Sequence, residues 1–196
     1  MSPTPTNRIP VEAALRVLAE LRDDRHLVVT NQGSARLWPR LSQHPCDFNY
    51  NPSTMGGAIA LGLGLALARP QREVVVISGD GSLLMSLGSL VTVRDSGVTN
   101  LSIVLLENGI YEVTGRQRTP ASQGEIAFAD LAQAAGFSTA TRLQTLATWQ
   151  EQAAHLLSAA GPRFICLQVN EIQNDCLQDA SEPMTDQLPR LRRALS

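Results

Sequence analysis

Four consecutive β-branched residues at positions 74–77 are followed almost at once by the polar run Gly79-Asp80-Gly81-Ser82. An unbroken β-branched run is typical of a strand that is buried on both faces of a parallel sheet. Residues 83–95 read as a helix closed by Gly97, and residues 101–106 form a second apolar run. This βαβ pattern predicts an α/β fold, a doubly wound parallel sheet with helices on both faces.

The rest of the chain gives less regular signals around this unit. We expect helices at residues 10–21, 54–68, 128–135 and 143–160, and strands at residues 27–30 and 164–169. Repeated Gly and Ala in the 54–68 helix would let another backbone approach closely. Residues 107–125 read as a polar loop, and residues 36–52 as a long irregular connection of the kind that often carries function.

Length and charge limit the class of protein. A chain of 196 residues suits one domain, residues 1–196, with residues 1–7 and 171–196 as peripheral tails. A net charge of -2 offers nucleic acid no basic face. The longest apolar run, residues 55–68, is too short to cross a membrane, and the first residues do not resemble a signal peptide. We therefore expect a cytoplasmic protein without nucleic-acid or membrane partners, and reduced thiols at Cys46, Cys166 and Cys176.

Polar side chains follow both predicted buried strands of the βαβ unit. Asp80 comes after the first strand and Asn108 after the second, so both should lie at the carboxyl edge of the sheet, where ligands bind in such folds. Free amides at the start of the following helix would attract a phosphate, but the Asp80 carboxylate would repel it unless a divalent cation lay between them. Oxygen ligands from Asp80, Asn108 and a backbone carbonyl suit Mg²⁺. The alternative is that both residues only cap turns.

The ordered pair of Gly79-Asp80-Gly81-Ser82 and Asn108 resembles the diphosphate motif of thiamine diphosphate enzymes, over residues 51–119. The resemblance implies bound thiamine diphosphate and Mg²⁺, with the backbone carbonyl of Ile110 completing the metal site. It also implies that Met55 wedges under the cofactor and holds its V-shape, a catalytic positioning role, while the carbonyl of Ser53 receives the aminopyrimidine amine. The implied cofactor contacts are Ser53, Met55, Gly79, Asp80, Gly81, Ser82, Asn108, Ile110 and Tyr111. Ordinary core packing is the alternative for Met55.

Within that family the chain is most similar to the sulfopyruvate and phosphonopyruvate decarboxylase branch. The similarity rests on Met55-Gly56, the run at 58–68, and Asn108-Gly109 followed by Gly115, Gln117 and Thr119. Two features depart from the branch: residues 53–56 read Ser-Thr-Met-Gly where Gly-Ser-Met-Gly is usual, and Glu107 stands where Asn or Asp is usual. The resemblance implies the beta-type subunit of a lyase that decarboxylates a small 2-oxo acid.

The family also needs a glutamate against the pyrimidine ring, and it belongs to a separate pyrimidine-binding domain that this chain has no room for. Glu12, Glu20 and Glu73 are expected to be solvated instead. We therefore expect a partner subunit that supplies the glutamate, a hetero-oligomer, and a chain that is inactive alone. The alternatives are a carboligase of acetolactate-synthase type and a non-catalytic thiamine diphosphate-binding module.

Three further residues are candidates for contact with the substrate. His44 lies in the 36–52 connection, which would approach the thiazolium side of the cofactor, so it is a candidate for proton transfer. Arg116 and Arg118 follow the predicted metal loop and would suit a 2-oxo acid with a second acidic group. Plain surface positions are the alternative for all three residues.

Overall fold

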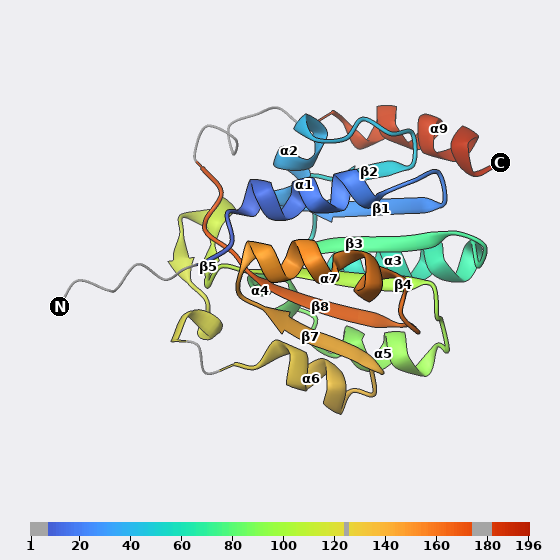
Figure 1. The fold of residues 1–196 in the computed structure, drawn as a ribbon. Coiled ribbons are helices and arrows are strands. Elements are labelled where there is room, and N and C mark those ends of the chain that lie inside the picture. The colour runs from blue at the N-terminus through green and yellow to red at the C-terminus, as the bar shows by residue number, and fades with distance from the viewer. Residues whose placement is uncertain (1–7, 124–125, 174–181) are drawn as a thin grey trace.

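The computed structural model describes residues 8–123, 126–173 and 182–196. Its centre is a six-stranded sheet in the order β2-β1-β3-β4-β8-β7, in which every neighbouring pair is parallel (Figure 1). The strands are β1 His26–Asn31, β2 Asp47–Tyr50, β3 Glu73–Gly79, β4 Leu101–Glu107, β7 Thr139–Leu143 and β8 Arg163–Gln168. The tail predicted at residues 1–7 lies outside the described residues.

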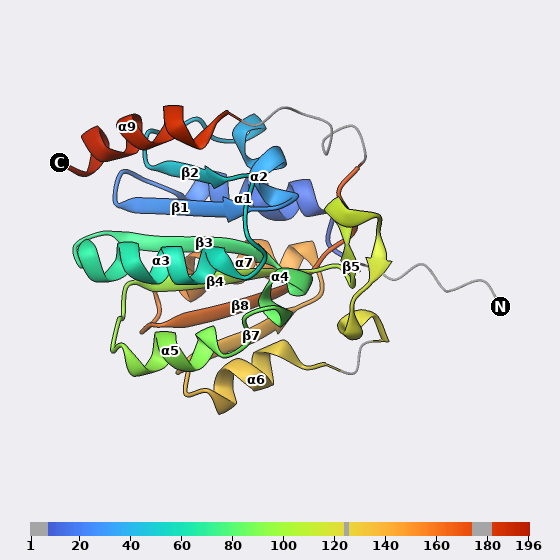
Figure 2. The same cartoon turned by 180° about the vertical axis from the view of Figure 1, so that it is seen from behind.

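Helices cover both faces of the sheet, so the predicted doubly wound α/β fold is confirmed. α1 Val11–Leu21 and α7 Leu146–Ser158 pack together on one face. α3 Gly57–Ala68, α5 Ser89–Asp95 and α6 Phe128–Ala134 cover the other face (Figure 2). The side chains of β3 and β4 alternate between the two hydrophobic cores, which explains why these strands read as unbroken apolar runs. Among the described residues, no helix is both long and apolar enough to cross a membrane.

The glycines of α3 let this helix lie directly on the sheet. A Cβ atom added to Gly62 would stand 2.1 Å from Cγ2 of Val76 in β3, whereas one added to Gly64 would meet no described atom within 4 Å. The Gly62 side of α3 therefore faces β3 without room for a methyl group. The Gly64 side is exposed and open.

We predict opposite stability effects for the same substitution at these two glycines. Gly62→Ala should destabilise the chain by about 1–3 kcal/mol, because the methyl group forces α3 away from Val76. Gly64→Ala should stabilise it by up to about 1 kcal/mol, because Ala is the better helix former. Urea unfolding followed by circular dichroism measures both changes. Equal effects of the two substitutions would contradict the close packing of α3 on β3.

The largest differences from the sequence prediction lie around the irregular segments. Residues 36–52 do not form a long loop but hold α2 Ser34–Leu37, the 3₁₀ helix Trp38–Arg40 and the edge strand β2. The helix predicted at 83–95 is two helices, α4 Asp80–Leu84 and α5, with residues 85–88 between them. The predicted loop at 107–125 contains the hairpin β5 Ile110–Tyr111 and β6 Gln117–Arg118, together with the 3₁₀ helices Glu112–Thr114 and Pro120–Gln123.

The C-terminal segment is also more ordered than a peripheral tail. α9 Met184–Leu195 packs against β2 at the top of Figure 1. Gln187 is fully buried there, and its amide accepts a hydrogen bond from Asn49 N (2.7 Å) and donates one to Asn49 O (3.1 Å). The prediction of a peripheral tail is therefore wrong for residues 184–195. The helix covers an edge strand whose backbone would otherwise stay exposed.

Candidate functional site

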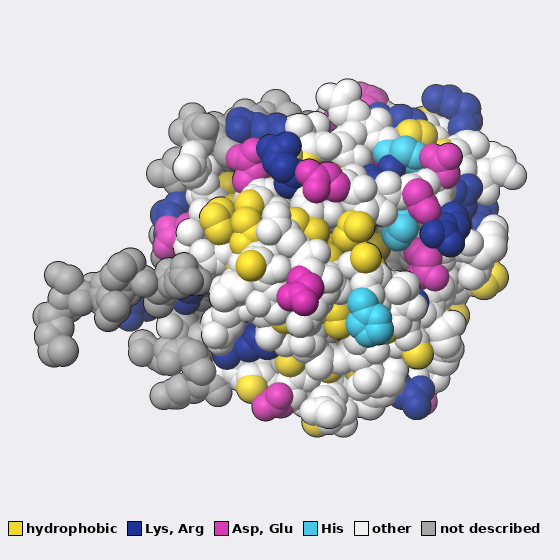
Figure 3. All heavy atoms as spheres, in the orientation of Figure 1, with side chains coloured by type: hydrophobic (Ala, Val, Ile, Leu, Met, Phe, Trp, Pro, Cys, Tyr) yellow, Lys and Arg dark blue, Asp and Glu magenta, His cyan; other side chains and the backbone are white. Residues whose placement is uncertain are grey.

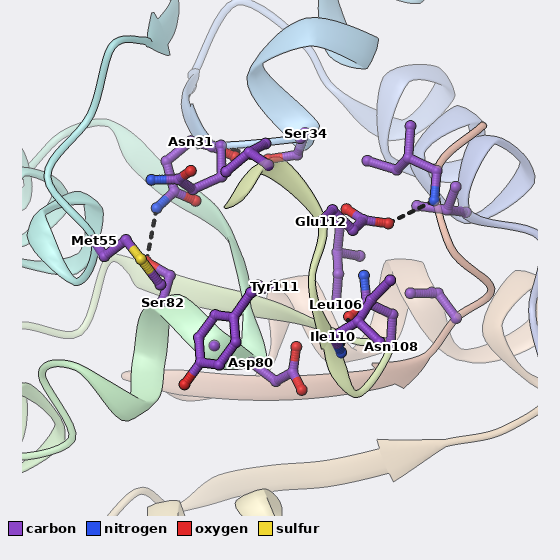
Figure 4. Close-up of a pocket in the computed structure, with 18 of the residues that line it drawn as sticks. Asn31, Ser34, Met55, Asp80, Ser82, Leu106, Asn108, Ile110, Tyr111 and Glu112 are labelled. Atoms are coloured by element: carbon purple, nitrogen blue, oxygen red, sulfur yellow. Dashed lines mark hydrogen bonds between the residues drawn. The ribbon is translucent and has the colours of Figure 1, made fainter. Parts of the chain in front are cut away.

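A cavity opens at the carboxyl edge of the sheet where the direction of winding reverses. From β1 the chain moves outward to β2, and it then returns past β1 to β3 and β4, so the segments that follow β1 and β3 separate. Open α/β sheets bind ligands at such a switch point. The cavity holds about 530 Å³ of space, partly open to solvent. Its lining includes residues 31–34, 79–82, 108 and 110–114 (Figure 4).

Asp80 is the buried carboxylate of this cavity. It is the first residue of α4 and is only 1% exposed. Its Oδ2 accepts hydrogen bonds from Gly109 N (3.1 Å) and Thr119 Oγ1 (2.9 Å). Burial raises the pKa of the Asp80 carboxyl, while the hydrogen bonds from Thr119, Gly81 and Gly109 act in the opposite direction. The fold thus holds a charge that needs a counter-charge, which a cation in the cavity would supply.

Asn108 lies opposite Asp80, at the end of β4. Its side-chain Oδ1 accepts a hydrogen bond from Ile110 N (2.9 Å), which fixes the amide within a tight turn. Its backbone carbonyl accepts a bond from Arg8 Nη1 (2.6 Å). Asp80, Asn108 and Ile110 all line the cavity, so the structure brings the three predicted metal ligands together. No cluster of three or more His, Cys, Asp or Glu suited to a metal occurs in the described part of the chain, which leaves a mixed set of carboxylate, amide and carbonyl oxygens.

A buried amide without a full set of partners also lines the cavity. Ser82 Oγ accepts bonds from Gly56 N (2.9 Å) and Asn31 Nδ2 (2.9 Å), whereas Asn31 Oδ1 has no partner among the described residues. Turning the Asn31 amide by 180° lets the Ser82 hydroxyl donate to Oδ1 and leaves the amide N–H groups for an acceptor in the cavity. A phosphate oxygen is such an acceptor. The buried polar groups therefore fit an anionic phosphate ligand.

The remaining predicted contacts surround the same space. Met55 lines the cavity, and Ser53 is held beside it by Gln32, whose Nε2 donates to Ser53 Oγ (2.9 Å). The Tyr111 ring packs on Gly81 so closely that a Cβ atom there would stand 2.5 Å from Tyr111 Cε1. Figure 4 shows Tyr111, Asp80, Ser82 and Met55 along one side of the cavity. Gly79, Gly81 and Ser82 also line it.

Glu112 is a cavity residue that the sequence did not indicate. Its Oε1 accepts a hydrogen bond from Ile172 N (2.6 Å), drawn as a dashed line in Figure 4. Burial raises the pKa of the Glu112 carboxyl, against the opposing effects of the Ile172 hydrogen bond and the Arg116 charge. Arg116 itself forms an ion pair with Glu171. Asn31, Thr119 and Glu112 are thus three polar residues of the site whose roles depend on long-range contacts.

His44 is not part of the cavity. Its Nε2 lies 2.9 Å from Asp24 Oδ1, and it precedes β2, so it stands at the edge where β1 and β2 begin. Strand β2 then carries the chain to the opposite edge, and only the residues after it reach the cavity. The prediction that His44 approaches the reacting end of a cofactor is therefore wrong. Figure 3 shows the face over α1 and α7, where hydrophobic side chains lie among scattered charged and histidine side chains.

Comparisons with known proteins agree with the fold. The model of the family described as "Thiamine pyrophosphate enzyme, C-terminal TPP binding domain" matches residues 30–167. Phosphonopyruvate decarboxylase of Streptomyces viridochromogenes is 37% identical over 159 residues, which cover 81% of this chain and 39% of that protein. Sulfopyruvate decarboxylase subunit beta of Methanothermobacter thermautotrophicus is 44% identical over 110 residues, covering 56% of this chain and 57% of that one.

Solved structures share the same fold. Benzoylformate decarboxylase from Polynucleobacter necessarius superimposes with a TM-score of 0.63 at 19% identity, over 88% of this chain and 34% of that chain. The chain spans about two fifths of the length of the Streptomyces relative. The Streptomyces relative therefore contains further sequence that has no counterpart among these 196 residues.

Proposed function

Since the chain belongs to the thiamine pyrophosphate enzymes and corresponds to their C-terminal TPP-binding domain, we propose that it binds thiamine diphosphate through Mg²⁺ as part of a 2-oxo acid decarboxylase. The observation that carries this proposal is the meeting of Asp80 and Asn108 in one cavity at the switch point of the sheet. The substrate class is taken from the phosphonopyruvate and sulfopyruvate decarboxylases among its relatives.

The metal would be held by Asp80 on one side and by the Asn108 turn on the other. Gly109 and Thr119 both bind Asp80 Oδ2, which sets the plane of the carboxylate. We assign Mg²⁺ to Asp80, the side-chain oxygen of Asn108 and the backbone carbonyl of Ile110, with diphosphate oxygens and water as the other ligands. Mg²⁺ prefers such oxygen ligands.

The other residues of the cavity would orient the organic part of the cofactor. Gly79, Gly81 and Ser82 give the diphosphate close access to the backbone, and the Asn31 amide would donate to it. Met55 would support the cofactor and hold it in its V-shape. The backbone carbonyl of Ser53 would accept a hydrogen bond from the aminopyrimidine amine, and Tyr111 would pack against the cofactor. Bound thiamine diphosphate supplies the carbon nucleophile and the electron sink for decarboxylation. The share of this chain is therefore positioning, charge balance and exclusion of water.

Calorimetric titration of the chain with thiamine diphosphate tests this proposal. We expect heat of binding when Mg²⁺ is present and none when EDTA removes the metal, because the diphosphate and Asp80 repel each other without a cation. Binding that is unaffected by EDTA would contradict the metal bridge. The absence of binding in saturating Mg²⁺, both by the folded chain alone and by the chain mixed with a pyrimidine-domain subunit, would contradict the proposal as a whole.

We further propose that a second chain with a pyrimidine-binding domain completes the site and supplies the activating glutamate. The name of the Methanothermobacter relative, subunit beta, supports a partner subunit. Exposed apolar side chains in and before the helices α3 and α5 also support it: Leu67 of α3, Met85 after α4 and Val91 of α5 are each more than half exposed. We call these three residues the α3–α5 surface. Exposed apolar side chains that form one patch often mark a protein interface.

Charged substitutions on the α3–α5 surface should weaken assembly without unfolding the chain. We expect Met85→Glu combined with Val91→Glu to lower affinity for a co-expressed pyrimidine-domain subunit by at least about tenfold, because each would bury a charge at the interface. Sedimentation velocity measures the complex, and thermal melting checks the fold. Leu188→Glu, at an exposed position on α9, is the matched control. Equal affinity of the double variant and the control would exclude this surface.

A further inference from the structure

The residue before Asn108 carries a charge that is almost fully buried. Glu107 is 3% exposed and ends β4. Its carboxylate accepts two bonds from one guanidinium, Arg142 Nε to Oε2 (2.9 Å) and Arg142 Nη2 to Oε1 (2.6 Å). Cys166 Sγ also lies 3.1 Å from Oε2. A bidentate pair of this kind fixes direction as well as distance.

This pair ties three strands together at the edge that carries the cavity. Cys166 of β8 lies opposite Arg142 of β7, and Gln168 of β8 lies opposite Glu107 of β4. The Glu107 side chain therefore reaches across β8 to β7. Its backbone carbonyl is held as well, by Val169 N (3.1 Å). The residue from which the Asn108 turn begins is thus anchored by both its side chain and its backbone.

Stability alone does not explain a charged pair at this position. The strand before it is buried along its whole length, and an apolar residue would fill the same place without the cost of removing two charges from water. The pair also lies near a third charge, because the Glu107 carboxylate acts electrostatically on Asp80.

We infer that the Glu107–Arg142 pair is a positioning device for the metal site, an inference that rests on the proposed function. By fixing the end of β4, the pair sets the Asn108-Gly109 turn, in which Asn108 offers its oxygen and Gly109 N binds Asp80 Oδ2. Both metal-binding side chains are therefore oriented before a cation arrives. Neither Glu107 nor Arg142 lines the cavity, so they act through Asn108 and Asp80. Partners that orient metal ligands in this way commonly change metal affinity by about 10–100-fold.

The chain offers a second ion pair between strands, at the opposite edge of the sheet, as a control. Arg163 Nη1 lies 2.7 Å from Glu73 Oε2, and the Arg163 side chain is 6% exposed. Arg163 begins β8 and Glu73 begins β3, so this pair also crosses strands but lies away from the cavity. The Glu73 side chain is 37% exposed, so Glu73→Gln removes a more exposed ion pair between strands without touching the Asn108 turn.

The experiment uses calorimetry to follow the binding of thiamine diphosphate to the full chain at increasing Mg²⁺ concentrations. The measured quantity is the Mg²⁺ concentration at which binding is half-maximal. We expect Glu107→Gln to raise this half-maximal Mg²⁺ concentration by at least about tenfold. Arg142→Lys should do the same, because lysine keeps the charge but lacks the fork that binds both carboxylate oxygens. Glu73→Gln should leave it within about twofold of the wild type. Thermal melting in EDTA gives the melting temperature of each variant without metal. All titrations are then run below the lowest of these melting temperatures, so that a change in metal affinity is not confused with a loss of stability.

Each result decides the inference. Wild-type affinity in Glu107→Gln and Arg142→Lys would overturn the positioning role and leave the proposed function intact. An equal loss in Glu73→Gln would also overturn it, because weakening the sheet anywhere would then suffice. Retained affinity in Arg142→Lys alone would show that charge balance and not geometry matters, and would overturn it as well. A wild-type chain that binds no cofactor, either alone or with a pyrimidine-domain subunit, would instead refute the proposed function, and the inference would then be refuted as well.

Discussion

Asp80→Asn should lower the affinity of the chain for thiamine diphosphate in Mg²⁺ by at least about 100-fold, equivalent to about 2.7 kcal/mol of binding free energy. The substitution keeps the size of the side chain but removes the negative charge that would face the cation. Because Asp80 is only 1% exposed, water cannot replace the lost attraction. Calorimetric titration at fixed Mg²⁺ measures the loss.

The control for Asp80→Asn is the same change at an exposed acid. Asp130 lies on the solvent side of α6, so Asp130→Asn should bind as the wild type does. The fold of both variants is checked by circular dichroism. Undiminished, metal-dependent binding by Asp80→Asn would remove Asp80 from the metal site and with it the central contact of the proposed function.

The elements that the sequence predicts well are those with strong local signals. β3 and β4 are buried on both faces, so their apolar residues run without interruption, and the polar residues after them mark the carboxyl edge of the sheet. Two such strands in a βαβ unit fix the place where Asp80 and Asn108 must meet. That part of the site follows from sequence because one strand pairing determines it.

Edge strands gave no comparable signal. β7 is only half-buried over most of its length, and β2 has four residues, so neither shows a continuous apolar run or a long alternation. Missing β2 led directly to the wrong place for His44, because a strand moves the chain from one edge of the sheet to the other. Missing β7 hid Arg142, the partner of Glu107. α9 escaped prediction for a similar reason, since buried Gln187 finds its partner 138 residues away, at Asn49.

Polar residues of the cavity were missed because residue type alone does not show which turn faces inward. Asn31 and Ser34 follow the strand predicted at residues 27–30, yet Asn31 forms a hydrogen bond with Ser82, which lies 51 residues further along the chain. Thr119 holds Asp80 over 39 residues, and Glu112 holds Ile172 over 60 residues. Each of these contacts depends on the packing of loops that are distant in the sequence, so no local sequence pattern predicts it.

Gly81→Ala should also reduce cofactor affinity by about 100-fold, through a change of one methyl group. The new Cβ atom would stand 2.5 Å from Tyr111 Cε1 and 3.3 Å from Thr119 Cγ2. Tyr111 would have to leave its place in the cavity, and Thr119, which orients Asp80, would be pushed with it. Overpacking of this kind costs about 1–3 kcal/mol in stability, so the variant should fold with a lowered melting temperature.

Two variants separate this steric effect from a general intolerance of alanine. Gly88→Ala introduces the same methyl group at a helical backbone angle, φ −60°, where no described atom lies within 4 Å, so it should bind as the wild type does. Gly81→Ala combined with Tyr111→Ala removes the clashing ring and should melt no lower than Tyr111→Ala alone, a non-additivity expected of residues in contact. The double variant should still bind the cofactor less tightly than the wild type, because Tyr111 is itself a proposed contact. If the two losses of stability instead add, Tyr111 does not pack on Gly81, and the hairpin that carries Tyr111 does not form this wall of the cavity.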